Sequence, residues 1–171
     1  MTAASFVYYP TSTSALSGSL TSEWADTTIE GSRPAMRVEP LLNRIIVKVE
    51  GRMPSWLETA KRDINGLLRL GGNWDSYQAR RINPESAAAA IRFLGLVMQE
   101  NTLLPFIVPM SSGDIQLEWH SSGVDIEVEV TQDGPTNLSI EDQSQRLAVS
   151  SSVYGNPGLL KQVMLKLPHR K

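Results

Sequence analysis

Carboxylates and one imidazole recur at short intervals in residues 114–130, and their types and spacing could support chemistry. Carboxylate oxygens are the ligands that hard divalent cations prefer, and imidazole is tolerated beside them, so this set could hold Mg²⁺ or Mn²⁺. An ion held there would indicate a hydrolase that acts on phosphodiesters. The candidate metal ligands are Asp114, Glu118, His120, Glu127 and Glu129.

The elements that must position these side chains are two half-buried strands. Apolar and polar residues alternate in residues 114–120 and again in residues 124–130. Ser122 and Gly123 lie between the two stretches and suit a two-residue hairpin turn, which places Trp119 opposite Ile126. One face of the hairpin is then wholly apolar, and it holds Ile115, Leu117, Trp119, Ile126, Val128 and Val130.

The polar face of this hairpin gathers like charges. In the same register Glu118 lies directly opposite Glu127, which is mildly unfavourable unless water, a cation or a basic surface covers the pair. A flat sheet spaces carboxylates about 5 Å apart without a pocket, and neither strand carries a lysine that could stabilise a phosphate. A solvated face or a protein-docking face is therefore favoured over a metal site. Its candidate partner-binding residues are Glu118, Asp125, Glu127 and Glu129.

Charge is segregated along the chain, although the net charge is only −2. Residues 93–145 contain nine acids and no base, whereas residues 146–171 contain five bases and no acid. Either the chain's own basic helices and tail neutralise the acidic strands, or a protein partner with a basic surface does so. The acidic strands disfavour nucleic-acid binding, which stays an alternative through Arg80, Arg81, Arg92 and the C-terminal bases.

A second candidate surface is the loop at residues 73–81. Two aromatic residues, a carboxylate and two guanidinium groups within nine residues could form a binding surface. The competing interpretation is structural: Trp74 would fill the seam between two helices, while Asn73 and Asp75 would accept hydrogen bonds from turn amides. The candidate partner-binding residues of this loop are Trp74, Asp75, Tyr77, Arg80 and Arg81.

The remaining patterns predict an α+β fold. Ser55 and Glu58 have the spacing of a capping box at the start of one amphipathic helix, and Asn83 followed by Pro84 starts a second. We expect an antiparallel β-meander of about four strands with both helices packed on its apolar face. An odd loop around residues 133–135 is expected to place Val130 opposite Leu138. Short strands are also expected at residues 44–50 and at the proline-bracketed residues 105–109.

The predicted domain boundaries follow composition. Residues 1–40 are expected to form a flexible arm rich in serine and threonine, residues 41–155 the α+β domain, and residues 156–171 a short amphipathic helix with a basic tail. The 171 residues include no cysteine, which excludes disulfides and thiolate chemistry. No stretch approaches the roughly 20 apolar residues of a membrane span. We therefore expect a cytoplasmic protein that requires no membrane and no cofactor.

Residues 70–79, a proline-opened helix and the two acidic strands together resemble a group of small bacterial and phage-borne proteins without an established activity. The likeness covers about residues 55–131. Members usually carry glycine where this chain has Ser76 and Gln78, and they look like accessory proteins encoded beside a second small protein. The resemblance thus implies a non-catalytic interaction or regulatory role. The hydrolase and the nucleic-acid binder stay as alternatives, and homo-oligomerisation stays open.

Overall fold

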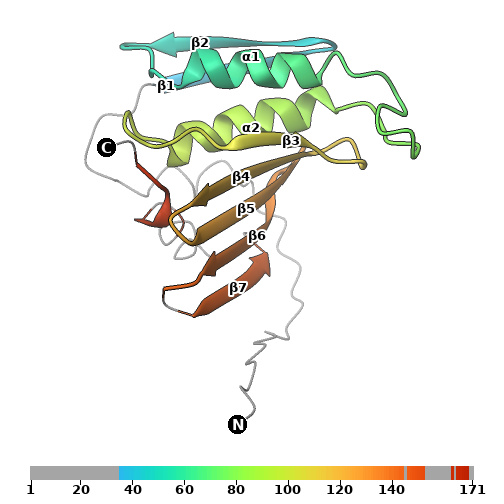
Figure 1. Cartoon of the computed structure of the whole chain (residues 1–171). Helices are drawn as coiled ribbons and strands as arrows, with labels where there is room; N and C mark the ends of the chain where they lie inside the picture. The colour runs from blue at the N-terminus through green and yellow to red at the C-terminus, as the bar shows by residue number, and fades with distance from the viewer. Residues whose placement is uncertain (1–34, 145, 153–162, 164, 170–171) are drawn as a thin grey trace, which may run out of the picture. The chain divides into compact units, whose positions relative to one another are not determined.

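The computed structural model describes residues 35–144, 146–152, 163 and 165–169, and these form an α+β fold with two antiparallel sheets (Figure 1). A hairpin of two strands comes first, two helices follow, and five strands form a meander in the order β3-β4-β5-β6-β7. The elements are β1 (Ala35–Leu41), β2 (Arg44–Glu50), α1 (Leu57–Leu67), α2 (Pro84–Val97), β3 (Phe106–Pro109), β4 (Ile115–Ser121), β5 (Val124–Thr131), β6 (Gly134–Asp142) and β7 (Leu147–Ser152).

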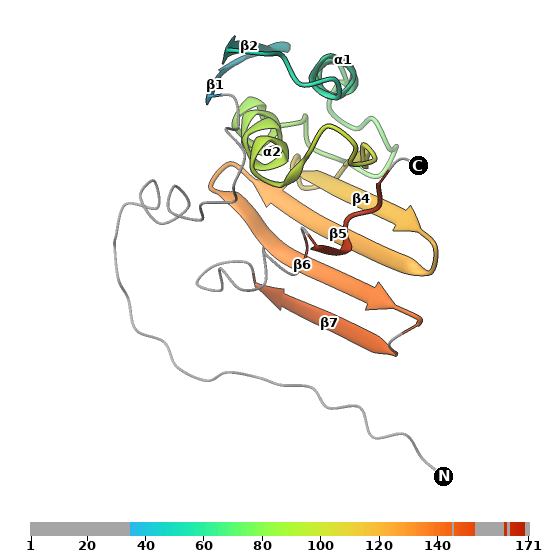
Figure 2. The same ribbon diagram turned by 90° about the vertical axis from the view of Figure 1, so that its left-hand side faces the viewer.

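The predicted α+β class is confirmed, but the layering differs from the expected one. The meander has five strands because residues 106–109 join it as edge strand β3. Only α2 packs across the middle of this sheet, against β4, β5 and β6. On its other side α2 contacts the β1–β2 hairpin, while α1 lies against β2, β3 and α2 (Figure 2).

Helix α2 is enclosed because it lies between the hairpin and the sheet. All four residues of its alanine run, residues 87–90, are buried, which lets both neighbouring backbones approach closely. Its predicted start is confirmed, since the Asn83 side chain accepts the Glu85 N–H at 3.0 Å and Pro84 is the first helical residue.

The capping box predicted for α1 is wrong. The helix begins at Leu57, and no side chain caps it. The Ser55 hydroxyl donates to the Glu100 carbonyl at 3.4 Å, and Glu58 pairs with Lys61 at 2.6 Å. Both side chains of the expected box are thus engaged elsewhere.

The β4–β5 register is confirmed residue for residue, with Trp119 opposite Ile126 and Glu118 opposite Glu127. The β5–β6 register is not the expected one, since Leu138 lies opposite Val128 rather than Val130. The turn has only two residues, and a bulge at Glu129/Val130 shifts the pairing by one position. The bulge returns the apolar residues of β6 to the inner face, where Leu138 and Ile140 are 2% exposed.

The expected arm and C-terminal segment are only partly covered by the described residues. Strand β1 begins at Ala35, inside the segment predicted to be a flexible arm, while residues 1–34 lie outside the described part. Near the other end, Val163 and Leu167 are buried and Lys166 pairs with Asp142. Most of the predicted C-terminal helix falls on residues that are not described. Among the described residues no helix has the length and apolarity that a membrane crossing requires.

Candidate functional site

The face of the five-stranded sheet that points away from α2 carries the predicted site residues of β4 and β5; we call it the outer face. Side chains alternate along β4, so Leu117 and Trp119 are buried on the inner face while Glu118 and His120 point outward. The same alternation applies to β5 and β6. The charged, amide and imidazole side chains of the outer face are Gln116, Glu118, His120, Asp125, Glu127, Glu129, Asn137 and Glu141.

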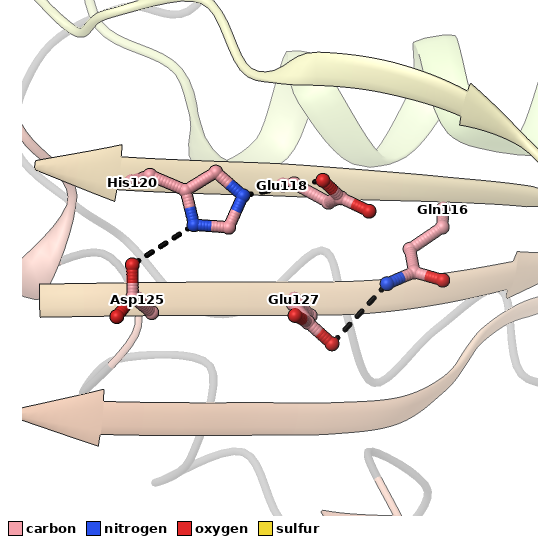
Figure 3. A network of polar contacts seen from close by, with 5 residues as sticks. All are labelled: Gln116, Glu118, His120, Asp125 and Glu127. Atoms are coloured by element: carbon pink, nitrogen blue, oxygen red, sulfur yellow. Dashed lines mark hydrogen bonds and ion pairs between the residues drawn. The ribbon is translucent and has the colours of Figure 1, made fainter.

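His120 joins two strands of the outer face (Figure 3). Its Nδ1 lies 2.9 Å from an Asp125 oxygen on β5, and its Nε2 lies 3.2 Å from a Glu118 oxygen on its own strand. Hydrogen bonds to Asp125 and then to Glu118 raise the pKa of the His120 imidazole above its ordinary value. His120 thus pairs with Asp125 across the two strands, and protonation would make the imidazole a cationic bridge between two carboxylates.

Glu118 and Glu127 lie opposite each other, but their carboxylates have different hydrogen-bond partners. Glu118 turns toward His120, whereas Glu127 accepts a hydrogen bond from Gln116 Nε2 at 3.2 Å (Figure 3). Farther along the same face, Glu129 accepts from Asn137 Nδ2 at 2.6 Å. Neutral amides and one imidazole therefore relieve part of the repulsion expected from the sequence.

Asp114, one of the five ligands of the alternative metal site, does not lie with the other four. It precedes β4, and its two oxygens accept hydrogen bonds from Ser86 of α2 at 2.8 Å and from Ser112 at 2.9 Å. Within the described residues no three His, Asp or Glu side chains are grouped closely enough to hold a metal ion.

The loop at residues 73–81 is fixed by its own side chains. Asn73 Oδ1 accepts the Gln78 N–H at 2.7 Å, and Asp75 Oδ1 accepts the N–H groups of Tyr77 and Ala79 at 2.7 and 3.0 Å. These bonds confirm the predicted turn-stabilising role of both residues. Trp74 is half-buried, and its indole N–H donates to the Arg80 carbonyl at 3.2 Å.

The same loop exposes its other candidate residues. Tyr77 is 87% exposed, and Arg80 and Arg81 are also exposed. The loop is attached to the β3–β4 connection, where Arg80 N–H donates to the Ser111 carbonyl at 2.9 Å. No ion pair within the described residues joins either arginine to a carboxylate of the outer face. The structure thus presents two separate candidate surfaces.

Sequence reasoning overlooked two members of the outer face. Glu141 lies opposite Asp125, and Phe106 lies opposite Glu118 on the edge strand. Phe106 is 66% exposed, and its ring centroid is 6.1 Å from that of His120. The alternation of β6 could have indicated Glu141, whereas the position of Phe106 depends on a pairing that the four-residue strand does not reveal.

The comparisons with known proteins give no match to this chain, whether with a family model, a curated protein or a solved structure.

Proposed function

We propose that the chain is a non-catalytic interaction protein whose outer face docks a basic segment of another protein. The observation that carries this proposal is the charge balance of that face. Five carboxylates lie on it, and His120 is the one titratable cation among the described residues of β3–β7. The carboxylates are Glu118, Asp125, Glu127, Glu129 and Glu141.

No lysine or arginine among the described residues forms an ion pair with a carboxylate of this face, although exposed Arg146 lies in the turn between β6 and β7. Helices α1 and α2 lie on the other side of the sheet (Figure 2). Lys166, the one described lysine of the C-terminal segment, pairs with Asp142, which is 2% exposed and follows Leu138 and Ile140 on the inner face. The tail bases Lys161, Arg170 and Lys171, which could cover the face from within the chain, lie outside the described residues. A basic partner would complement the same negative charge.

The hydrogen bonds of the face favour docking over catalysis. Glu127 and Glu129 accept hydrogen bonds from the neutral side-chain amides of Gln116 and Asn137 rather than from a cationic side chain. Exposed Phe106 beside His120 adds an apolar contact at one edge. The resemblance to accessory proteins, carried by residues 70–79 and the two acidic strands, supports the same role.

The experiment uses an octalysine peptide as a defined basic probe for the full-length protein. Glu127→Lys combined with Glu129→Lys should raise its dissociation constant by about tenfold or more and should flatten its dependence on salt, because charge on an exposed face acts through screened attraction. Both side chains point away from the core, so the circular dichroism spectrum should not change.

The matched control is Glu50→Lys combined with Glu100→Lys, which changes the net charge equally at exposed positions away from the outer face. An equal loss of affinity in both double variants would reduce the effect to net charge and refute the docking face. Unchanged binding in the Glu127/Glu129 variant would refute it as well.

A further inference from the structure

The two edges of the β1–β2 hairpin differ in how their backbone groups are satisfied. The two-residue turn makes Leu41 and Arg44 the closing pair, so hydrogen bonds to the neighbouring strand alternate from there. The backbone groups of Ile45 therefore point away from β1, and its N–H donates to Asn65 of α1 at 2.7 Å. Helix α1 flanks β2 in this way and obstructs its edge (Figure 2).

The other edge of the hairpin, on β1, has no strand beside it among the described residues. By the same alternation, the backbone groups of Met36, Val38 and Pro40 point outward. No hydrogen bond from the described residues reaches the outward groups of Met36 or Val38. Such a row of backbone donors and acceptors is a template for another strand.

The sequence of β1 is complementary to itself when two copies run antiparallel about Val38. Val38 then pairs with the partner's Val38 through two backbone hydrogen bonds, and Met36 N–H donates to the partner's Pro40 carbonyl. Pro40 has no N–H, so one bond is missing at each end of the ladder. Because Arg37 and Glu39 flank Val38, each Arg37 lies opposite the partner's Glu39.

The two faces of such a pairing are also compatible. On the exposed face Arg37 and Glu39 form an alternating row of charges, and partly exposed Leu41 lies over the partner's Ala35. On the face toward α2, the side chains of Val47 and Val38 form a row with Val38 and Val47 of the second copy. Neither face places like charges directly opposite one another across the new seam.

We propose that two copies of this chain associate through β1 and form a continuous four-stranded sheet with the order β2-β1-β1-β2. The interface is isologous, because the same strand serves both copies about a twofold axis at Val38. This contact lies on the hairpin and is independent of the outer face of the five-stranded sheet. Its success or failure leaves the docking proposal unaffected.

Disulfide trapping tests the register directly, since the chain has no cysteine of its own. In the proposed pairing Arg37 and the partner's Glu39 form a non-hydrogen-bonded pair with Cα atoms about 4.5 Å apart, within reach of a disulfide. Two copies of the same position lie on a diagonal, about 7–8 Å apart, which is too far. A mixture of Arg37→Cys and Glu39→Cys proteins should therefore form covalent dimers under mild oxidation, and each variant alone should form far fewer.

The matched control applies the same reasoning to the obstructed edge. Ile46→Cys mixed with Lys48→Cys would be trapped only if β2 paired with β2 about Val47, and it should give little product. Sedimentation of the wild-type protein should show a dimer at concentrations where trapping succeeds. The proposal would be overturned by equal yields in the β1 and β2 mixtures, or by an equal yield from one β1 variant alone. It would also be overturned if the wild-type protein were purely monomeric and no trapping occurred.

Discussion

Trp119 is the largest fully buried side chain of the sheet, and its removal should be the most damaging single change on the inner face. The residue is 2% exposed, and its indole N–H donates to the Leu103 carbonyl at 2.9 Å. Trp119→Ala should lower the free energy of unfolding by about 3–5 kcal/mol, the range of large aromatic truncations in cores. Part of this loss arises because the Leu103 carbonyl loses its donor.

A urea titration followed by far-ultraviolet circular dichroism measures this loss without depending on tryptophan emission. With a slope of about 2 kcal/mol per molar urea, a 4 kcal/mol loss moves the midpoint down by about 2 M. Trp119→Phe is the control, because it keeps much of the ring packing and removes the hydrogen bond, at a cost of about 1–3 kcal/mol. A loss below about 1 kcal/mol for Trp119→Ala would contradict the assignment of the inner face.

Three further predictions concern single side chains. The raised pKa of His120 means that its protonated form stabilises the fold below a pH of about 6.5. This stabilisation is lost as the pH rises through the pKa of the folded protein. The urea midpoints of His120→Gln and wild type should therefore differ less at pH 8 than at pH 5.5. Asn83→Ala should cost about 1 kcal/mol in the same assay because it removes the cap of α2, whereas Ser55→Ala should cost much less because Ser55 caps nothing. Ser76→Gly and Gln78→Gly should each raise stability by about 0.5–1 kcal/mol, because glycine adopts their positive φ angles of 64° and 71° without strain; a destabilised variant would contradict this reasoning.

The sequence was most informative where a turn fixes the pairing. Ser122 and Gly123 adopt positive φ angles of 53° and 77°, as a two-residue hairpin turn of the primed type requires. That turn sets the register of β4 against β5, and the alternation of the strands then decides which side chains point outward. The positions of Glu118, His120, Asp125, Glu127 and Glu129 on the outer face follow from these two facts alone.

The features that sequence reasoning misjudged depend on local irregularity or on distant contacts. A bulge adds one residue to one strand and shifts the pairing beyond it by one position, so the β5–β6 register could not be derived from the turn and an uninterrupted alternation. Strand β1 was not predicted, although Met36 and Val38 alternate with charged residues there, because Pro40 argues against a strand. Asp114 has the parity of the outer face, yet Ser86 of α2, 28 residues away in sequence, holds its side chain.

The loop at residues 73–81 shows how side chains can replace glycine in fixing a backbone. Ser76 and Gln78 occupy left-handed conformations, which glycine adopts more readily than other residues. Each such conformation costs about 1–2 kcal/mol for an ordinary residue, and the hydrogen bonds accepted by Asn73 and Asp75 within the loop oppose that cost. Tyr77 lies between these two residues with its own N–H bonded to Asp75, so hydrogen bonds hold the backbone that presents its exposed ring. A rigid, exposed aromatic residue loses little entropy on contact with a partner, and for this reason Tyr77 is the residue to substitute next if the outer face fails its test.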